Sequence, residues 1–192
     1  MANWDERYER GEHTNDAPHS LVVRIASGLP PGRALDIASG PGRHAIWLAQ
    51  RGWQVTAVDK STVAIDMLRH RSAEKGVSID SRIADLENHE LVIASEFYDL
   101  IVVCNYLQRD LFPVIKKGVC VGGVVIAIIA ISDDDLNIRP MNPDYLLNAG
   151  ELRTEFREWE LLWDFEGKPG TAQRATAQIA ARRPAAGALQ PK

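Results

Sequence analysis

Cysteine is scarce in this chain of 192 residues: there are two, Cys104 and Cys120, and both lie in apolar stretches. They form neither a zinc-type spacing nor a C-x-x-C motif, so we expect small buried side chains, a reducing compartment and no metal site. Long apolar runs are also lacking. The most apolar run, residues 119–131, is shorter than the roughly 20 residues of a membrane span. The charged first residues contain no apolar core of a targeting segment, which predicts a cytoplasmic protein without membrane contact.

An excess of basic residues is missing as well, because 22 Lys and Arg stand against 26 Asp and Glu, giving a net charge of −4. This balance argues against a dedicated nucleic-acid binder. The composition, with 45% hydrophobic and 25% charged residues, is that of an ordinary globular protein. At about 150 residues per domain, we expect a single domain over residues 1–182 and a flexible tail over 183–192. Within the domain, residues 1–29 form a predicted helical lid region. We expect a monomer, because the sequence shows no obvious extra element for an interface.

Apolar strands alternate with amphipathic helices along most of the chain. Helices are expected over 18–29 (with Pro18 in the first turn), 43–52, 61–76 (with Ser61 as the N-cap), 111–118 and 148–156. Strands are expected over 34–38, 53–59, 77–86, 97–105, 124–131, 156–167 and 171–183. The pattern predicts an α/β, Rossmann-like, doubly wound sheet of seven strands. The sheet should be mostly parallel, with an antiparallel hairpin at its C-terminal end after the polar loop 132–145.

A glycine turn follows the first predicted strand, in the sequence DIASGPGRH from Asp36 to His44. Glycines let the backbone approach a ligand closely, and the following helix directs free N–H groups at it. Gly40-x-Gly42-x-x-Ala45 also fits the loose dinucleotide fingerprint. A tight strand-to-helix turn without a ligand is the alternative interpretation.

Acidic residues stand at the ends of the next two predicted strands. Asp59, 19 residues after Gly40, is placed to accept two hydrogen bonds from a ribose diol, or else to cap a helix. Asp85 is placed to accept from an adenine amine while Leu86 covers the ring, although an Asp at a strand end is common. The turn and the first acid together are more specific than either alone.

DIASGPGR resembles the first motif of class I S-adenosylmethionine-dependent methyltransferases, usually D-x-G-x-G-x-G, with Ala38 replacing the first glycine. The resemblance implies S-adenosylmethionine as cofactor and S-adenosylhomocysteine as product. WDERYERGEH (4–13), NYLQRDLFPVI (105–115) and RPMNPDYLLNAGEL (139–152) are similar to segments of the small bacterial tellurite-resistance-type methyltransferases. The cofactor-binding residues predicted from the turn, the strand ends and the resemblance are Asp36, Ala38, Ser39, Gly40, Gly42, Arg43, Asp59, Lys60, Ser61, Asp85, Leu86 and Asn105.

The acceptor is expected to be a small molecule. A soft nucleophile, such as a thiol or a chalcogen oxyanion, would need no strong base, whereas an oxygen or nitrogen acceptor can need one. The candidates for a catalytic role are His13, Tyr106 and Arg109, each of which is otherwise an ordinary surface or loop residue. Other side chains with two interpretations are Trp4 and Tyr8 (lid or packed helix), His19 (base or surface), Arg43 and Arg139 (anion site or solvated), and Asp133, Asp134 and Asp135 (cation site or solvated). The charge of the acceptor stays open.

Two other functions are compatible with the sequence. An NAD(P)-binding oxidoreductase would use the same glycine turn and Asp59, and a non-catalytic S-adenosylmethionine-binding module would explain Ala38. The acids Asp36 and Asp85 and the C-terminal hairpin argue against the oxidoreductase. A DNA amino-methyltransferase is disfavoured because Asn105-Tyr106-Leu107 lacks the expected prolines.

Overall fold

The computed structural model describes residues 3–132, 141–170 and 174–185, and its contacts divide the chain into two compact units. The first unit holds residues 1–92 and 100–102, and the second holds residues 93–99 and 103–192. Seven strands form one sheet in the order β3-β2-β1-β4-β5-β7-β6. The predicted α/β fold, a mostly parallel sheet of seven strands with antiparallel C-terminal strands, is confirmed.

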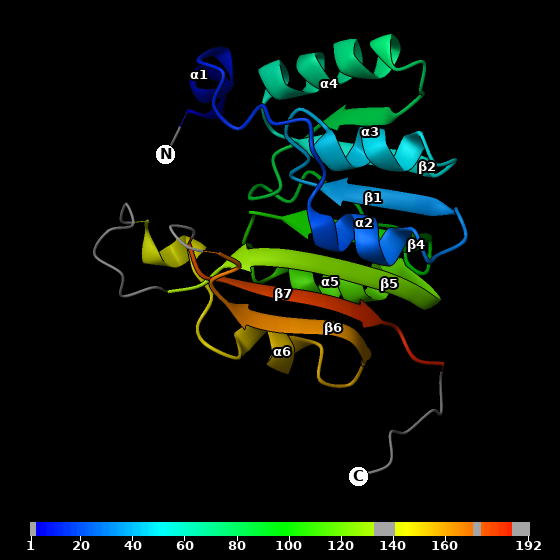
Figure 1. Cartoon of the computed structure of the whole chain (residues 1–192), viewed down its shortest axis with the longest axis vertical. Helices are drawn as coiled ribbons and strands as arrows, with labels where there is room; N and C mark the ends of the chain where they lie inside the picture. Colours follow the sequence, from blue (N-terminus) through cyan, green and yellow to red (C-terminus); the bar gives the residue numbers. More distant parts are fainter. Residues whose placement is uncertain (1–2, 133–140, 171–173, 186–192) are drawn as a thin grey trace. The chain divides into compact units, whose positions relative to one another are not determined.

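The first unit is built from alternating helices and parallel strands (Figure 1). Its elements are α1 (Trp4–Glu9), α2 (Ser20–Ala26), β1 (Arg33–Ile37), α3 (Arg43–Ala49), β2 (Gln54–Asp59), α4 (Thr62–Glu74) and β3 (Asp80–Ile83). β2 pairs in parallel with β1 on one side and with β3 on the other. α3 packs against β1 and β2, and α4 packs against β2 and β3. This packing helps to bury β1 and β2 along nearly their whole length.

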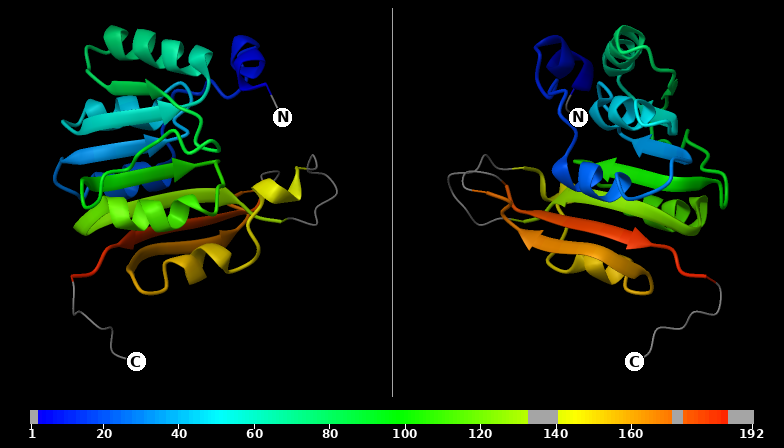
Figure 2. Two further views of the ribbon diagram at one scale, coloured as in Figure 1. Left: turned by 180° about the vertical axis from the view of Figure 1, so that it is seen from behind. Right: turned by 45° about the vertical axis from the view of Figure 1, so that its right-hand side comes forward.

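The second unit is built around an antiparallel group of strands. β4 (Tyr98–Cys104) is divided between the two units, and the other elements are α5 (Leu111–Gly118), β5 (Val119–Ala130), the short 3-10 helix η1 (Pro143–Tyr145), α6 (Glu151–Glu155), β6 (Glu160–Gly167) and β7 (Thr176–Arg182). β7 pairs antiparallel with both β5 and β6. α5 packs on β5 and α6 on β7, and both helices lie on one face of these strands (Figure 2, left).

The strand β6 contains a shift in its pairing with β7. Leu161 pairs with Ala181 and Trp163 with Ala180, so one extra residue is inserted between the two pairs. This arrangement is a β-bulge, which bends a strand and increases its twist.

Several predicted boundaries were wrong for local reasons. The third strand covers only residues 80–83 because the N–H of Val77 donates to Ser72 at the end of α4, and residues 85–90 form a turn. The fifth strand begins at residue 119 instead of 124 because hydrogen bonds between residues 122–123 and Arg183 carry the pairing through the glycines. α2 begins at Ser20, so Pro18 precedes the helix, and the ring Nδ1 of His19 accepts from the N–H of Leu21.

Some of the predicted segments can be compared with the structure and others cannot. The predicted start of the last strand at 171–173 lies outside the described residues, as does 133–140 in the polar loop and 186–192 in the tail. Ser61 is the N-cap of α4 as predicted, with its Oγ accepting from the N–H of Ala64. Among the helices of the described ranges, none combines the length and the apolar character needed to cross a bilayer.

Candidate functional site

The loop between β1 and α3 has left-handed backbone at three positions, Ala38 (φ +52°), Gly40 (φ +53°) and Gly42 (φ +82°). An L-residue in this region costs about 1–2 kcal/mol, so Ala38 adopts the conformation of a glycine at an energetic cost. A Cβ on Gly40 would lie 2.8 Å from the Tyr8 hydroxyl, and one on Gly42 would lie 2.6 Å from Cγ of Leu68. The absence of a side chain at Gly42 therefore allows Leu68 of α4 to pack onto the loop, and the predicted approach of Gly42 to a ligand stays a prediction.

Asp59 ends β2 and is buried directly beside this loop. Its Oδ2 accepts from the N–H of Gly40 at 2.7 Å, and its Oδ1 accepts from the N–H of Ser61 at 2.9 Å. Burial raises the pKa of the carboxyl, and the hydrogen bonds from the backbone oppose that rise. The helix cap belongs to Ser61, so the alternative interpretation of Asp59 as the cap is wrong.

Asp36, near the end of β1, is almost wholly buried and its Oδ2 accepts from the N–H of Ala45 at 3.1 Å. Nδ1 of the buried His44 lies 3.9 Å from the other carboxylate oxygen. Burial raises the pKa of Asp36 to about 7 and lowers the pKa of His44 to about 3. Between these two values both side chains are neutral, so the close approach is not an ion pair.

Asp85 orders a tight turn after β3. Its Oδ1 accepts from the N–H of Glu87 at 3.0 Å and its Oδ2 from the side-chain amide of Asn88 at 3.3 Å. Leu86 beside it is buried. These contacts give Asp85 a local structural role, and its contact with adenine stays a prediction.

The remaining predicted cofactor residues have separate structural roles. The N–H of Ser39 donates to the carbonyl of Val58, which ties the loop to β2. Lys60 pairs with Glu87 at 2.9 Å. Arg43 begins α3, and its positive charge helps to lower the pKa values of His13, His19 and His44. Asn105 belongs to the second unit, where it has φ +59° and donates its N–H to the carbonyl of Ile128.

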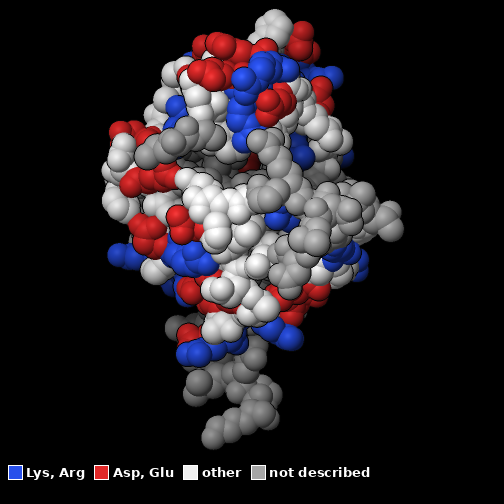
Figure 3. All heavy atoms as spheres, turned by 90° about the vertical axis from the view of Figure 1, so that its left-hand side faces the viewer, with Lys and Arg blue, Asp and Glu red and all other residues white. Residues whose placement is uncertain are grey.

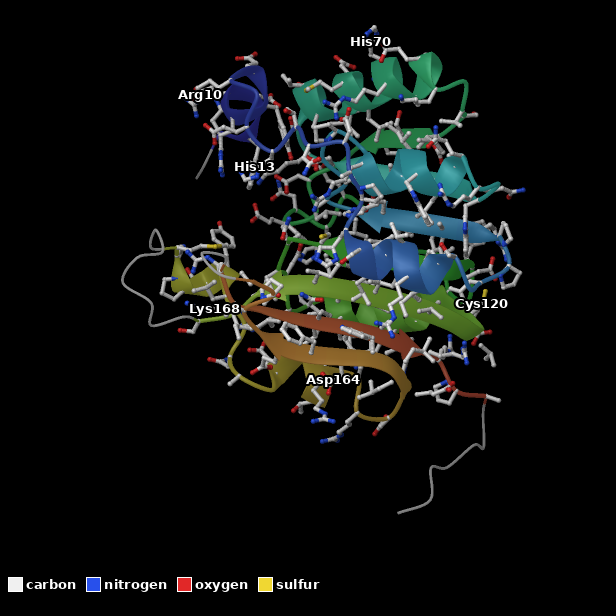
Figure 4. The ribbon with its side chains drawn as sticks, viewed as in Figure 1. Arg10, His13, His70, Cys120, Asp164 and Lys168 are labelled. Carbon is white, nitrogen blue, oxygen red and sulfur yellow. The ribbon has the colours of Figure 1, made fainter. Side chains whose placement is uncertain are left out.

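The N-terminal segment packs against α4 through α1. Tyr8 is buried, while the ring of Trp4 lies 6.0 Å from that of Tyr8 and 5.8 Å from that of His13. Figure 4 places Arg10 and His13 at the end of α1 and in the segment after it. Nη2 of Arg7 lies 2.5 Å from Nε2 of His13, whose pKa is lowered by burial and then by this neighbouring charge.

The polar groups of Tyr106 and Arg109, the catalytic candidates of the second unit, are hydrogen-bonded within the protein. The hydroxyl of Tyr106 donates to Gln108 at 2.7 Å. The guanidinium of Arg109 donates to both carboxylate oxygens of Glu151, at 2.6 and 3.0 Å, and to the carbonyl of Leu146. Arg139 and the acidic run 133–135 lie outside the described residues.

Two residues close to the site were not predicted from the sequence. His44 lies against Asp36, and Asp5 of α1 accepts from the hydroxyl of Ser61. The signal for Asp5 was available, since Asp5 and Tyr8 are three residues apart and therefore share a helix face. Acidic and basic side chains are interspersed on the face shown in Figure 3.

The strand order β3-β2-β1-β4-β5-β7-β6, with β7 antiparallel between β5 and β6, is the fold of class I S-adenosylmethionine-dependent methyltransferases. The family model of the tellurite resistance protein TehB matches residues 2–179, and the chain belongs to this family. It is 27% identical over 167 residues to a probable S-adenosyl-L-methionine-dependent methyltransferase TehB of Haemophilus influenzae. That match covers 82% of this chain and 56% of the relative, so the chain spans about half the length of the relative.

Solved structures show the same fold. The crystal structure of TehB from Haemophilus influenzae matches with a TM-score of 0.75 and 25% identity, over 93% of this chain and 67% of that one. A magnesium protoporphyrin IX methyltransferase from Synechocystis, solved with bound S-adenosylhomocysteine, matches with a TM-score of 0.64 and 18% identity, over 85% and 80% of the two chains.

Proposed function

We propose that this chain binds S-adenosylmethionine and transfers its methyl group to a small-molecule acceptor. The observation that supports this proposal most directly is the buried carboxylate of Asp59. It is fixed by the N–H groups of Gly40 and Ser61 at the end of a parallel strand, where ligands of such sheets bind. Membership of the TehB family and the methyltransferase relatives support the same activity.

The residues present fit an adenosyl ligand. The two carboxylate oxygens have about four lone-pair sites between them, so Asp59 retains acceptor capacity for a ribose hydroxyl after binding the backbone N–H groups of Gly40, Ser61 and Lys60. The left-handed loop at Ala38 and Gly40 brings its backbone close to Asp59, where the N–H of Gly40 donates to the carboxylate. In this proposal Asp36 and the loop hold the methionine part, Asp59 holds the ribose, and Asp85 and Leu86 hold the adenine.

The chemistry supplied by the bound cofactor is an electrophilic methyl group on a sulfonium. The protein then has to orient the acceptor for in-line displacement and exclude water. A soft acceptor, such as a thiolate or a chalcogen oxyanion, needs no general base. The engaged hydroxyl of Tyr106 and the paired Arg109 favour this class over acceptors that must be deprotonated.

Calorimetric titration with S-adenosylmethionine, S-adenosylhomocysteine and NADH tests the proposal. We expect micromolar binding of both adenosyl ligands and a loss of about 100-fold or more in affinity in Asp59→Ala, because hydrogen bonds to a charged group are lost. Asp66→Ala is the control, since this carboxylate is exposed on α4 and pairs with Arg69. Binding of NADH without binding of the adenosyl ligands would refute the proposal and favour an oxidoreductase.

A further inference from the structure

α1 contacts two of the three positions, Gly40 and Ser61, whose backbone N–H groups hold the Asp59 carboxylate; the third is Lys60. Asp5 contacts Ser61, and the hydroxyl of Tyr8 lies over Gly40. These two side chains are three residues apart, so one face of one short helix carries both. The helix therefore lies against two of the hydrogen bonds that fix Asp59.

Asp5 meets the polypeptide at the start of α4. The hydroxyl of Ser61 donates to Oδ1 of Asp5 at 2.5 Å, Val63 donates its N–H to the same oxygen at 3.4 Å, and the hydroxyl of Thr62 donates to Oδ2 at 3.3 Å. A carboxylate is favourable there because a helix N-terminus carries a partial positive charge. Ser61 thus connects three groups, since its N–H holds Asp59 and its Oγ both caps α4 and donates to Asp5.

Tyr8 is the one buried residue among residues 3–17, all of which the structure describes. A Cβ on Gly40 would lie 2.8 Å from its hydroxyl, so this hydroxyl fills the space that the glycine leaves open. Burial and then the negative charge of Asp59 raise the pKa of Tyr8. The hydroxyl of Tyr8 is therefore neutral at physiological pH and is close enough to Asp59 to be affected by its charge.

The rest of the N-terminal segment is held by polar contacts. Arg71 of α4 donates to the carbonyl of Thr14 at 3.1 Å and pairs with Asp16 at 2.7 Å. Because Tyr8 is its one buried residue, we expect this segment to open at a smaller free energy than that of global unfolding. Small changes in its contacts are thus sufficient to shift the balance between its closed and open forms.

We propose that Asp5 and Tyr8 are positioning residues that close α1 over Asp59, so that closure of residues 4–16 and binding of the adenosyl ligand form one coupled equilibrium. The inference rests on the proposed function for the identity of the ligand. Its physical basis is reciprocal: if closure fixes Ser61 and Gly40 around Asp59, a ligand held by Asp59 stabilises the closed segment equally.

Hydrogen exchange of the full chain with and without S-adenosylhomocysteine tests the coupling. We expect the ligand to slow amide exchange in residues 4–16 by about tenfold or more, which a rigidly docked helix would not show. Asp5→Ala should weaken binding of S-adenosylhomocysteine by about tenfold and reduce this protection, and Tyr8→Phe should do so by a smaller factor. Glu9→Ala is the control on the same helix, because Glu9 is exposed.

A double-mutant cycle separates positioning through Ser61 from a general loss of structure. In a Ser61→Ala background, Asp5→Ala should have a clearly smaller effect on the affinity, because the shortest of its three hydrogen bonds is already lost and only the longer ones to Thr62 and Val63 remain. Equal effects of Asp5→Ala in both backgrounds, or exchange of residues 4–16 unchanged by the ligand, would overturn the inference. If the unaltered chain bound no adenosyl ligand, the proposed function itself would fail, and that outcome is distinct from either of these.

Discussion

Among the described residues, the first unit buries carboxylates and the second unit does not, although both units have ion pairs at the surface, such as Lys60–Glu87 in the first. In the first unit Asp36 and Asp59 are buried, and their hydrogen bonds come from backbone N–H groups. In the second unit the carboxylates of Glu151 and Glu155 are partly exposed and pair with the cationic side chains of Arg109 and Lys116.

Buried carboxylates and carboxylates in surface ion pairs give different information about function. Burying a carboxylate is costly, and a fold keeps such a group mainly where a ligand or a proton uses it. Surface ion pairs contribute little to stability and carry little information about function. This explains why the cofactor side of the proposed site is well defined by the first unit, while the acceptor candidates Tyr106 and Arg109 carry no comparable signature.

The largest expected effect comes from neutralising the most buried acid. The pKa of Asp36 is raised from 3.8 to about 7, so the folded state binds more protons than the unfolded state between these values. Stability from this group is therefore present at low pH and lost as pH rises through about 7. At about 1.4 kcal/mol per pH unit, the difference in unfolding free energy between Asp36→Asn and the unaltered chain should grow by about 3–4 kcal/mol from pH 4 to pH 8.

His44 contributes a pH dependence of stability that is opposite in sign to that of Asp36. Its pKa is lowered from 6.5 to about 3, so its contribution is present above 6.5 and is lost as pH falls. The two groups act in opposite directions over most of this range, so the unaltered chain should show a shallow dependence on pH. Urea titrations between pH 4 and 8 test the prediction, and a constant offset between Asp36→Asn and the unaltered chain would contradict it.

A smaller effect is expected at the glycine loop. Gly42→Ala combines a left-handed backbone at φ +82° with a Cβ only 2.6 Å from Leu68, so we expect a loss of about 3 kcal/mol in unfolding free energy. Gly150→Ala in the second unit is the matched control, since it has φ +70° and open space around it, and it should lose only about 1 kcal/mol. Thermal or urea unfolding measures both, and equal losses would show that packing on Leu68 is unimportant.

The smallest effect is expected in the second unit. Arg109→Gln breaks the pair with Glu151, but both groups are at or near the surface, so the loss should stay below about 1 kcal/mol and shrink in high salt. Urea unfolding at two salt concentrations tests this. A loss above about 2 kcal/mol would remove the contrast between the two units.

The sequence predicted those parts of the fold that depend on local pattern. The apolar runs of β1, β2 and β4, the helix α5 and the Ser61 cap were predicted because each is determined by neighbouring residues. The start of β5 was missed because glycines usually end a strand, whereas here Gly122 and Gly123 keep their hydrogen bonds with Arg183.

The candidate site divides in the same way. Asp36 and Asp59 were predicted from the motif and the strand ends, and the structure buries both beside the loop. The contact of Asp5 with Ser61 joins residues 56 positions apart, and the Leu68 side chain fills the space at Gly42 from another helix. Such contacts depend on tertiary packing, which no local pattern specifies.

The bulge in β6 has a consequence for how copies of this protein behave at high concentration. β3 and β6 are the outer strands of the sheet, and unpaired outer strands invite pairing with another molecule. β3 offers only four residues, including the exposed charges of Asp80 and Arg82, and β6 is bent between Leu161 and Trp163. Both edge strands are thus poor templates for the addition of a strand from another molecule. This property disfavours aggregation through the edges of the sheet.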